Sequence, residues 1–209
     1  MKRNIAIIAG IILLMASNSL FAQDKANKLL ADLTKNIETH ENMVVDFTYQ
    51  ITDNSTQDGE MNLGKVGKAF FKGDAYCIKM EDQHTISDGT TKWTYYPDDK
   101  EVLVSNITEG DISPLAFLSE IKEHGTAKLK DTDSEGNTTI EILESDGSAT
   151  GFSIQFDKKG NVKKIVMDFD EEGRMILTII ETKYDQKLSP DQFTFNTATY
   201  PNVEVIDMR

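Results

Sequence analysis

The sequence contains a single cysteine, Cys77, among its 209 residues. No internal disulfide can therefore form, which excludes the small extracellular scaffolds that disulfides hold together. The thiol lies in an apolar stretch, residues 75–78, where we expect a small core residue. A secreted domain of this kind must rely on its own hydrophobic core, and the bacterial periplasm fits that pattern.

Signatures of catalysis and of metal binding are also lacking. The three histidines, His40, His84 and His124, are far apart and have no metal-ligand spacing. The sequence has no nucleophile elbow and no phosphate-binding glycine loop. Two acidic turns, starting at Asp131 and Asp168, resemble the first half of a calcium loop, but isoleucine stands where the loop needs its final glutamate. We therefore predict solvated turns there, and no enzyme, metal site or cofactor.

Basic residues are scarce beside acidic ones. The chain has 22 Lys and Arg against 35 Asp and Glu, a formal net charge of −13. Two of the basic residues, Lys2 and Arg3, lie in a segment that we expect to be removed, which leaves 22 − 2 = 20 and a charge of 20 − 35 = −15. Such a surface repels nucleic acid and anionic headgroups, and it favours solubility or a basic partner.

The long hydrophobic run is confined to the N-terminus, where residues 5–16 are almost wholly apolar. It follows the two basic residues, precedes the small-residue segment 17–22, and is short for a membrane span. These features predict a secretory signal peptide, residues 1–22, cleaved after Ala22; an uncleaved anchor is the alternative. Residues 23–209 are expected to form one domain in the periplasm.

Hydrophobic periodicity divides the rest of the chain into one helix and many strands. Apolar residues recur at helical spacing over residues 25–39. From Val44 the period becomes two, with Val45, Phe47, Tyr49 and Ile51 alternating with polar residues. Further strands are expected near 60–71, 75–80, 84–88, 91–96, 101–106, 127–131, 138–144, 151–157, 161–169 and 174–184. About eleven short antiparallel strands predict a mainly β sandwich or barrel.

One hairpin carries the only tryptophan. Asp88-Gly89 separates two β-prone runs and predicts a tight turn. On the outgoing strand, Trp93 and Tyr95 share one face, and Tyr96 lies on the other with Thr94. We expect Trp93 and Tyr95 to face the interior and Tyr96 to pack outside.

Two segments interrupt the strand pattern. Ser113-Pro114 predicts the start of a short apolar helix that continues to Ile121. This helix either covers one end of a barrel or crosses over the core, and the sequence leaves both possibilities open. In the tail, residues 189–191 predict a helical turn before a short strand with Phe193 and Phe195, and Val203 and Val205 predict a last strand.

In these features the chain resembles the LolA family of periplasmic lipoprotein carriers. Residues 86–97 are similar to the family's Ser-Asp-Gly…Trp…Tyr…Pro hairpin, and residues 47–53 to its first strand after the helix. Residues 113–118 resemble its Pro-led helix, and residues 152–162 and 191–195 its closing strands. Each motif is weak alone, but the five stand in the family's order over nearly the whole mature chain.

The resemblance implies an incomplete antiparallel β-barrel of about eleven strands, with an N-terminal helix, a short helical lid and an apolar cavity for acyl chains. It implies a monomer that receives lipoproteins from an inner-membrane lipoprotein-releasing ABC transporter and passes them to an outer-membrane acceptor. The predicted cavity wall consists of Val45, Phe47, Tyr49, Tyr76, Ile78, Trp93 and Tyr95. The predicted lid consists of Leu115, Phe117, Leu118 and Ile121.

The sequence departs from the family where an arginine is expected to latch the lid. Lys72 is the nearest candidate, and its ammonium cannot reproduce the planar fork of a guanidinium. Alternatives to the carrier are a module that senses lipid or lipoprotein without transporting it, and an envelope-assembly protein with a filled interior. For each wall residue, ordinary core packing is the competing interpretation.

Overall fold

The computed structural model describes residues 23–52, 64–107, 125–144, 146–169 and 173–209. Residues 23–39 form the predicted N-terminal helix. The twelve strands are β1 (Met43–Thr52), β2 (Lys65–Lys72), β3 (Ala75–Lys79), β4 (His84–Ser87), β5 (Thr91–Tyr96), β6 (Glu101–Asn106), β7 (Gly125–Thr132), β8 (Thr138–Glu144), β9 (Ala149–Phe156), β10 (Val162–Phe169), β11 (Gly173–Tyr184) and β12 (Glu204–Asp207).

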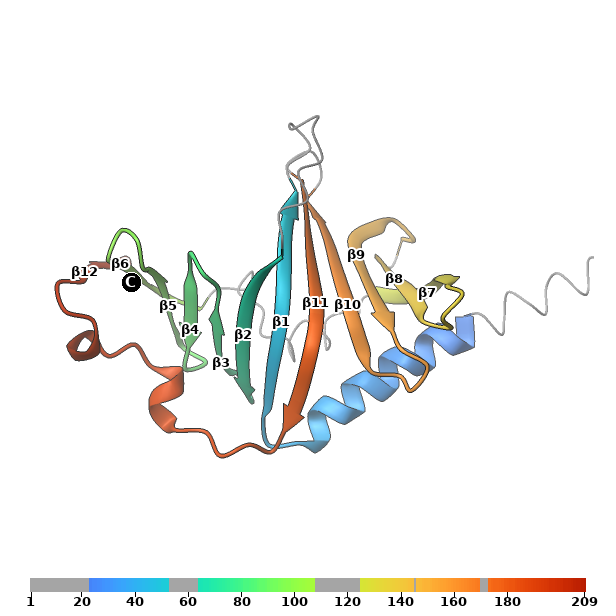
Figure 1. Ribbon diagram of the computed structural model, residues 1–209, viewed down its shortest axis with the longest axis horizontal. Helices are drawn as coiled ribbons and strands as arrows, with labels where there is room; N and C mark the ends of the chain where they lie inside the picture. The colour runs from blue at the N-terminus through green and yellow to red at the C-terminus, as the bar shows by residue number, and fades with distance from the viewer. Residues whose placement is uncertain (1–22, 53–63, 108–124, 145, 170–172) are drawn as a thin grey trace, which may run out of the picture.

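All twelve strands belong to one open sheet, in the order β12-β6-β5-β4-β3-β2-β1-β11-β10-β9-β8-β7. Neighbouring strands are antiparallel except for β12, which pairs in parallel with β6. The first long strand, β1, and the last, β11, lie at the middle, and the sheet extends from them toward β12 on one side and β7 on the other (Figure 1). The two end strands do not pair, so the predicted incomplete barrel is confirmed.

The pairing register shows which side chains share a face. Across one half of the sheet, Tyr49 is opposite Leu177, Leu177 opposite Ile165, Ile165 opposite Ile154 and Ile154 opposite Ile140. Directly paired antiparallel residues point to the same side of a sheet. We call the side that carries these residues the helix face, because the N-terminal helix packs on it.

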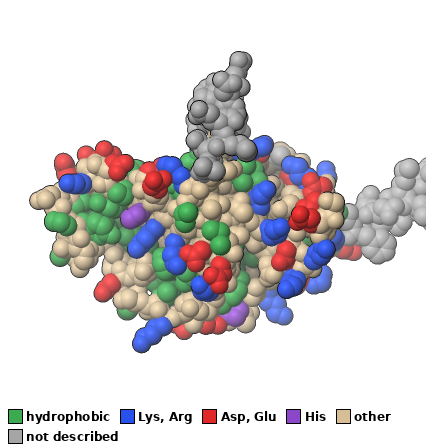
Figure 2. Space-filling model, in the orientation of Figure 1, with side chains coloured by type: hydrophobic (Ala, Val, Ile, Leu, Met, Phe, Trp, Pro, Cys, Tyr) green, Lys and Arg blue, Asp and Glu red, His purple; other side chains and the backbone are tan. Residues whose placement is uncertain are grey.

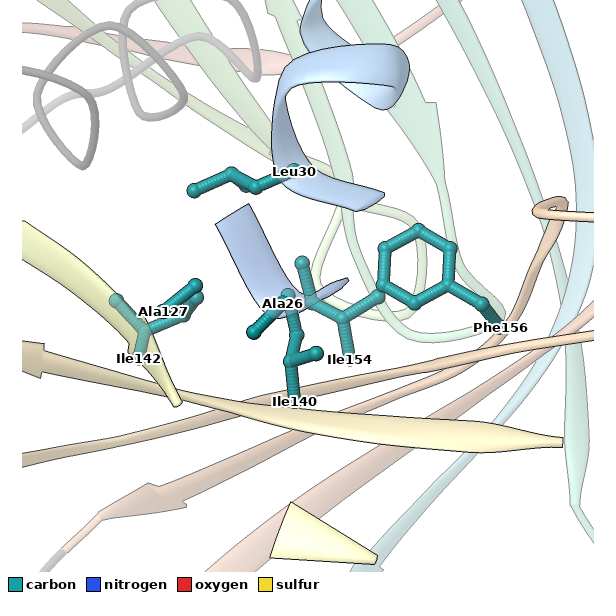
Figure 3. Close-up of a cluster of buried hydrophobic side chains, with 7 residues drawn as sticks. All are labelled: Ala26, Leu30, Ala127, Ile140, Ile142, Ile154 and Phe156. Atoms are coloured by element: carbon teal, nitrogen blue, oxygen red, sulfur yellow. The ribbon is translucent and has the colours of Figure 1, made fainter. Parts of the chain in front are cut away.

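The helix covers the β7–β9 part of this face. Ala26 and Leu30 are buried against Ile140, Ile154 and Phe156, as Figure 3 shows, in a cluster that also contains Ala127 and Ile142. The helix therefore places its predicted apolar stripe, which includes Leu29, Leu33 and Ile37, on the sheet. This burial, more than helix propensity, is what stabilises a helix of such length.

The other face of the β3–β6 part is covered by the C-terminal segment. A short 3-10 helix, η1 (Pro190–Phe193), buries Phe193 against Cys77 and Ile86. The helical turn predicted at residues 189–191 is thus present, but Phe193 ends that turn and Phe195 lies outside any strand, so the short strand predicted for them is wrong. The last predicted strand is present as β12.

The Asp88-Gly89 turn forms as predicted between β4 and β5. Gly89 has a φ of 94°, in the left-handed region that glycine adopts without strain. The Asp88 carboxylate accepts the backbone N–H groups of Thr90 at 2.9 Å and Thr91 at 2.8 Å. These bonds hold the pKa of Asp88 below its ordinary value, against a burial effect in the other direction.

A candidate apolar binding site

An apolar row runs along β1 on the helix face, beside the part that the helix covers. We define the β1 row as Met43, Val45, Phe47 and Tyr49. Its neighbours come from β2, β3, β11 and the β3–β4 turn, and they are Ala69, Phe71, Ile78, Met80, Leu177 and Ile179. This cluster contains no residue of the N-terminal helix, so it is a second apolar centre on the same face.

The Phe47 ring lies over Gly67 of β2, where the absence of a side chain leaves room for it. Gly67 is directly opposite Phe47 in the register. A Cβ atom added to Gly67 would stand 2.4 Å from both Cε2 and Cζ of the Phe47 ring. The ring thus occupies the space that any larger residue at Gly67 would need, and its own side chain is only 5% exposed.

Tyr49 closes one end of the row. Its hydroxyl accepts the backbone N–H of Glu81 and donates to the Asp82 carboxylate, both at 3.2 Å. Met80, one residue earlier in the same β3–β4 turn, packs against the row. The Tyr49 side chain is 2% exposed, and this burial raises the pKa of its hydroxyl. The hydroxyl therefore stays protonated and keeps both hydrogen bonds.

At the opposite end of the row is a small surface hollow with room for little more than one water molecule. Met43 and Phe71 line it, together with Ile37 from the helix and the segment His40–Asn42. Lys72 borders this region and donates a hydrogen bond to the Glu41 carboxylate at 2.8 Å. The role of Lys72 as a latch stays a prediction, because residues 108–124, which include the predicted lid, lie outside the described residues.

The junction beside the hollow is closely bonded. The Asp185 carboxylate accepts from the backbone N–H of Glu41 at 2.8 Å and lies 2.7 Å from Nδ1 of His40. The His40 ring is stacked on Tyr184 with 4.3 Å between centroids. The hydrogen bond with His40 is the main reason that the pKa of Asp185 lies below its ordinary value. These contacts fix the end of the helix to the end of β11.

Five of the predicted wall residues lie on the helix face, and two do not. Val45, opposite Ala69, is followed across the sheet by Ile78, Thr85 and Thr94. Phe47, Tyr49 and Tyr76 share this side with them. That these five line an acyl site stays a prediction.

Trp93 and Tyr95 point the other way, and their placement in the same wall as Phe47 is wrong. Each alternates with Thr94, which faces the helix side, so Tyr96 faces that side too, contrary to our expectation. Trp93 packs with the Cys77 cluster, and Tyr95 contacts Phe195 and Tyr200 of the C-terminal segment. Strand periodicity separates the two faces of β5, but only the register across β1–β5 tells which face is which.

The sequence analysis also missed several members of the β1-row cluster. Met80 gave no pattern of its own because it lies just past the end of β3, and Gly67, which is opposite Phe47 but outside the cluster, gave none because it has no side chain. Leu177 and Ile179 alternate along β11 and so share a face, a signal that was available. Which part of β1 they would meet depends on the pairing of the first long strand with the last, which the sequence does not reveal.

Nothing among the described residues suggests a metal centre, since no group of three or more His, Cys, Asp or Glu side chains is placed to hold an ion there. In the same described part of the chain, no helix is long and apolar enough to cross a membrane. Acidic and basic side chains are interspersed on the surface seen in Figure 2.

The sequence also matches a known protein family. The sequence model of the family described as "Outer membrane lipoprotein carrier protein LolA" matches residues 38–196. The chain belongs to the LolA family. This match includes the whole β1 row and omits most of the N-terminal helix and all of β12.

Solved structures resemble the chain at low sequence identity. An uncharacterised conserved protein from Thermus thermophilus has a TM-score of 0.53 and 12% identity, over 88% of this chain and 99% of that one. A LolA superfamily protein from Nitrosomonas europaea has a TM-score of 0.41 and 10% identity, over 81% and 97% of the two chains. A putative outer membrane lipoprotein-sorting domain from Vibrio parahaemolyticus has a TM-score of 0.41 and 11% identity, over 82% and 97%. Among curated proteins, none matches the sequence significantly.

Proposed function

We propose that the protein is a carrier that binds the acyl chains of lipoproteins along the β1 row and moves them across the periplasm to the outer membrane. Residues 1–22 would direct export, and the mature chain would load at an inner-membrane ABC transporter and unload at an outer-membrane acceptor. The cargo would be bound without chemical change, so the activity is transport and not catalysis.

The observation that carries this proposal is the second apolar cluster on the helix face. A filled sandwich would use one continuous core between two layers. Here the helix and strands β7–β9 form their own core, and the β1 row forms another on the same open sheet without the helix. Such a second apolar centre has the chemistry that an apolar ligand needs. Because Val45, Phe47 and Tyr49 are at most 9% exposed, a ligand would reach them only if the structure around the row opens.

The energetics explain why a lipoprotein needs such a site. Moving an acyl chain into water costs about 0.8 kcal/mol for each methylene group, so one long chain costs roughly 10 kcal/mol and several cost a multiple of that. Lipoproteins therefore do not leave a membrane unaided. A row of Val, Phe, Tyr and Met side chains offers the chain an environment close to that of the bilayer interior.

Release requires that the binding be broad and unspecific. The four side chains of the β1 row carry one polar group, the Tyr49 hydroxyl, and the β3–β4 turn already engages it. Lys65 and Thr182 are opposite the row on the neighbouring strands, and the other cluster members are apolar. Cargo held through many weak apolar contacts can be passed to a more apolar acceptor without breaking a strong specific bond. This arrangement favours a carrier over a tight storage site.

Site-specific photo-crosslinking tests where the acyl chain binds. We would replace Phe47 with p-benzoylphenylalanine and irradiate the protein with a radiolabelled triacylated lipopeptide. The matched control carries the same group at Val66, which neighbours Gly67 on β2 but is 70% exposed on the opposite face. We expect labelling from position 47 and little from position 66.

Equal labelling at the two positions, in proteins with native circular dichroism, would remove the basis for a site on the helix face. Labelling at position 66 alone would place the ligand on the wrong side of the sheet. Binding at position 47 without later delivery to a membrane would favour the sensing module over the carrier.

A further inference from the structure

The open sheet ends in two edge strands, β7 and β12, which differ in how their free side is protected. On β7, the side chain of Gln23 donates a hydrogen bond to the Ala127 carbonyl at 2.8 Å, and a register shift interrupts the pairing with β8. Lys128 and Lys130 are exposed along the same strand. Bulges and lysines of this kind keep an edge strand from pairing with another chain.

On β12, alternate backbone groups point away from the sheet. The N–H groups of Glu204 and Met208 both donate at 2.8 Å to carbonyls on the β6 side. Because alternate residues of a strand face opposite neighbours, the N–H and C=O groups of Val205 and Asp207 point to the other side. Within the described ranges no strand lies on that side, and these groups have no backbone partner. The strand therefore offers a template to which an extended segment can add.

The side chains at the centre of β12 are apolar and exposed on both faces of the sheet. Val205 is 49% exposed and Ile206 is 36% exposed, and successive residues of a strand point to opposite faces. Met208, just beyond the strand, is 58% exposed. Figure 2 shows hydrophobic side chains gathered at this end of the molecule, with acidic side chains at their border. A neighbouring strand would cover apolar surface on both faces at once.

The strand is fixed at both ends, although it has only four residues. Before it, the Tyr200 ring stacks on Phe195 with 4.5 Å between centroids and contacts Tyr95 of β5 at 4.7 Å. After it, the Arg209 guanidinium donates to both carboxylate oxygens of Asp207, at 2.9 and 2.6 Å. The edge thus has its shape before a partner binds, which lowers the entropy cost of binding.

Acidic side chains determine which partner fits this edge. Glu204 is directly opposite Glu101 of β6, so the two carboxylates lie on the same face. Neither takes part in an ion pair in the part of the chain that the structure describes. Like charges directly opposite destabilise a sheet, and a Lys or Arg on an added strand would relieve this repulsion. A second copy of a chain with a net charge of −13 would increase it.

We propose that β12 is a docking edge for an extended basic segment of a partner protein, which adds to the sheet as a further strand. Its apolar residues would cover Val205 and Ile206, and a Lys or Arg would lie beside Glu204. Five strands separate β12 from β1, so this interaction surface is distinct from the β1 row and does not depend on the proposed transport.

Fluorescence anisotropy with the labelled peptide Thr-Arg-Val-Val-Arg-Val-Thr and the purified protein tests the docking edge. Antiparallel to β12, this peptide places valine opposite Val205 and Ile206 and arginine opposite Glu204 and Asp207. Val205→Pro removes an N–H that points away from β6, and an edge strand accepts proline at such a position. Glu204→Lys reverses the charge and leaves the backbone unchanged. The matched control is Glu38→Lys, which makes the same change of net charge on an exposed residue of the N-terminal helix.

We expect Val205→Pro and Glu204→Lys each to weaken peptide binding by about ten-fold or more, because each removes one directed interaction with the added strand. Glu38→Lys should change the affinity by less than about two-fold, since exposed charges this remote are screened by salt. A peptide with glutamate in place of both arginines should bind the wild type weakly and Glu204→Lys more tightly. If Val205→Pro loosens β12, as judged by circular dichroism, Glu204→Lys still decides the result.

The proposal is overturned if the wild type does not bind the arginine peptide, or if both β12 variants bind it as the wild type does. An equal loss of binding in Glu38→Lys would assign the attraction to net charge and would overturn it too. A wild-type dimer in sedimentation velocity that Val205→Pro dissociates would assign the edge to a second copy of this chain instead. None of these results affects the acyl site, which the crosslinking at position 47 tests separately.

Discussion

Replacing Gly67 with alanine gives a direct test of how Phe47 is positioned. The new Cβ would stand 2.4 Å from two atoms of the Phe47 ring and 3.1 Å from a third. Carbon atoms in contact prefer about 3.5–4.0 Å, so the rigid ring must move by about 1 Å or more. Overpacking of this kind costs about 1–3 kcal/mol of unfolding free energy.

A double-mutant cycle separates this clash from other effects of the substitution. Phe47→Ala alone is expected to cost about 3–5 kcal/mol, because it leaves a cavity at a buried site. In that background the clash is gone, and Gly67→Ala should stabilise the strand by about 0.5–1 kcal/mol through the lower backbone entropy of the unfolded chain. The sign of the Gly67→Ala effect thus reverses, and the coupling energy is about 2 kcal/mol or more.

Urea unfolding followed by far-ultraviolet circular dichroism gives the four free energies. Gly64→Ala serves as a control, because the nearest atom to its new Cβ is Thr48 Cβ at 3.3 Å, a much milder contact. Additivity of the two substitutions within about 0.5 kcal/mol would mean that the Phe47 ring does not lie over Gly67, and the described arrangement of the β1 row would be incorrect.

Other regions of the molecule yield further predictions. Tyr49→Phe removes both hydroxyl hydrogen bonds to the β3–β4 turn and should lower the unfolding free energy by about 1 kcal/mol. Amide hydrogen exchange should become faster in that turn alone, and exchange unchanged from the wild type would argue against these two hydrogen bonds. Gly151→Ala should destabilise by more than Gly147→Ala, since both have positive φ but only the first would place a Cβ 2.7 Å from a backbone carbonyl of β10, and equal thermal midpoints would contradict this. Because the folded pKa of Asp185 lies below its ordinary value, its bond with His40 stabilises the fold above about pH 4 and loses effect as the pH falls through the folded pKa. Asp185→Asn should therefore lower the thermal midpoint at neutral pH and differ less from the wild type at pH near 3; a difference that grows on acidification would refute the assignment.

Local patterns predicted the elements of this fold well. The alternation of Val45, Phe47 and Tyr49 and the helical spacing around Leu30 each depend on one segment, and the structure confirms both. The turn at Gly89 was predictable for the same reason, because its chemistry is contained in a few neighbouring residues.

Predictions that depended on contacts across the sheet were less successful. Trp93 and Tyr95 were assigned to the wrong face of the sheet. Their strand, β5, is four strands from β1, and the sequence does not show which face of β5 lies on the same side as Phe47. The strand predicted at Phe193 and Phe195 is wrong because two alternating aromatic residues also suit a 3-10 turn followed by a loop that packs on a sheet. The pairing of β1 with β11, which builds the row, joins segments more than 100 residues apart and left no local trace.

Release of a lipoprotein from inner-membrane vesicles is the measurement that bears most directly on the proposed transport. Purified residues 23–209 would be incubated with vesicles that contain a labelled lipoprotein and the energised ABC transporter, and the soluble fraction would then be offered to outer-membrane vesicles. The account predicts a soluble one-to-one complex that transfers its lipoprotein to the outer-membrane vesicles. Lipoprotein that stays in the inner-membrane vesicles despite an active transporter would contradict it.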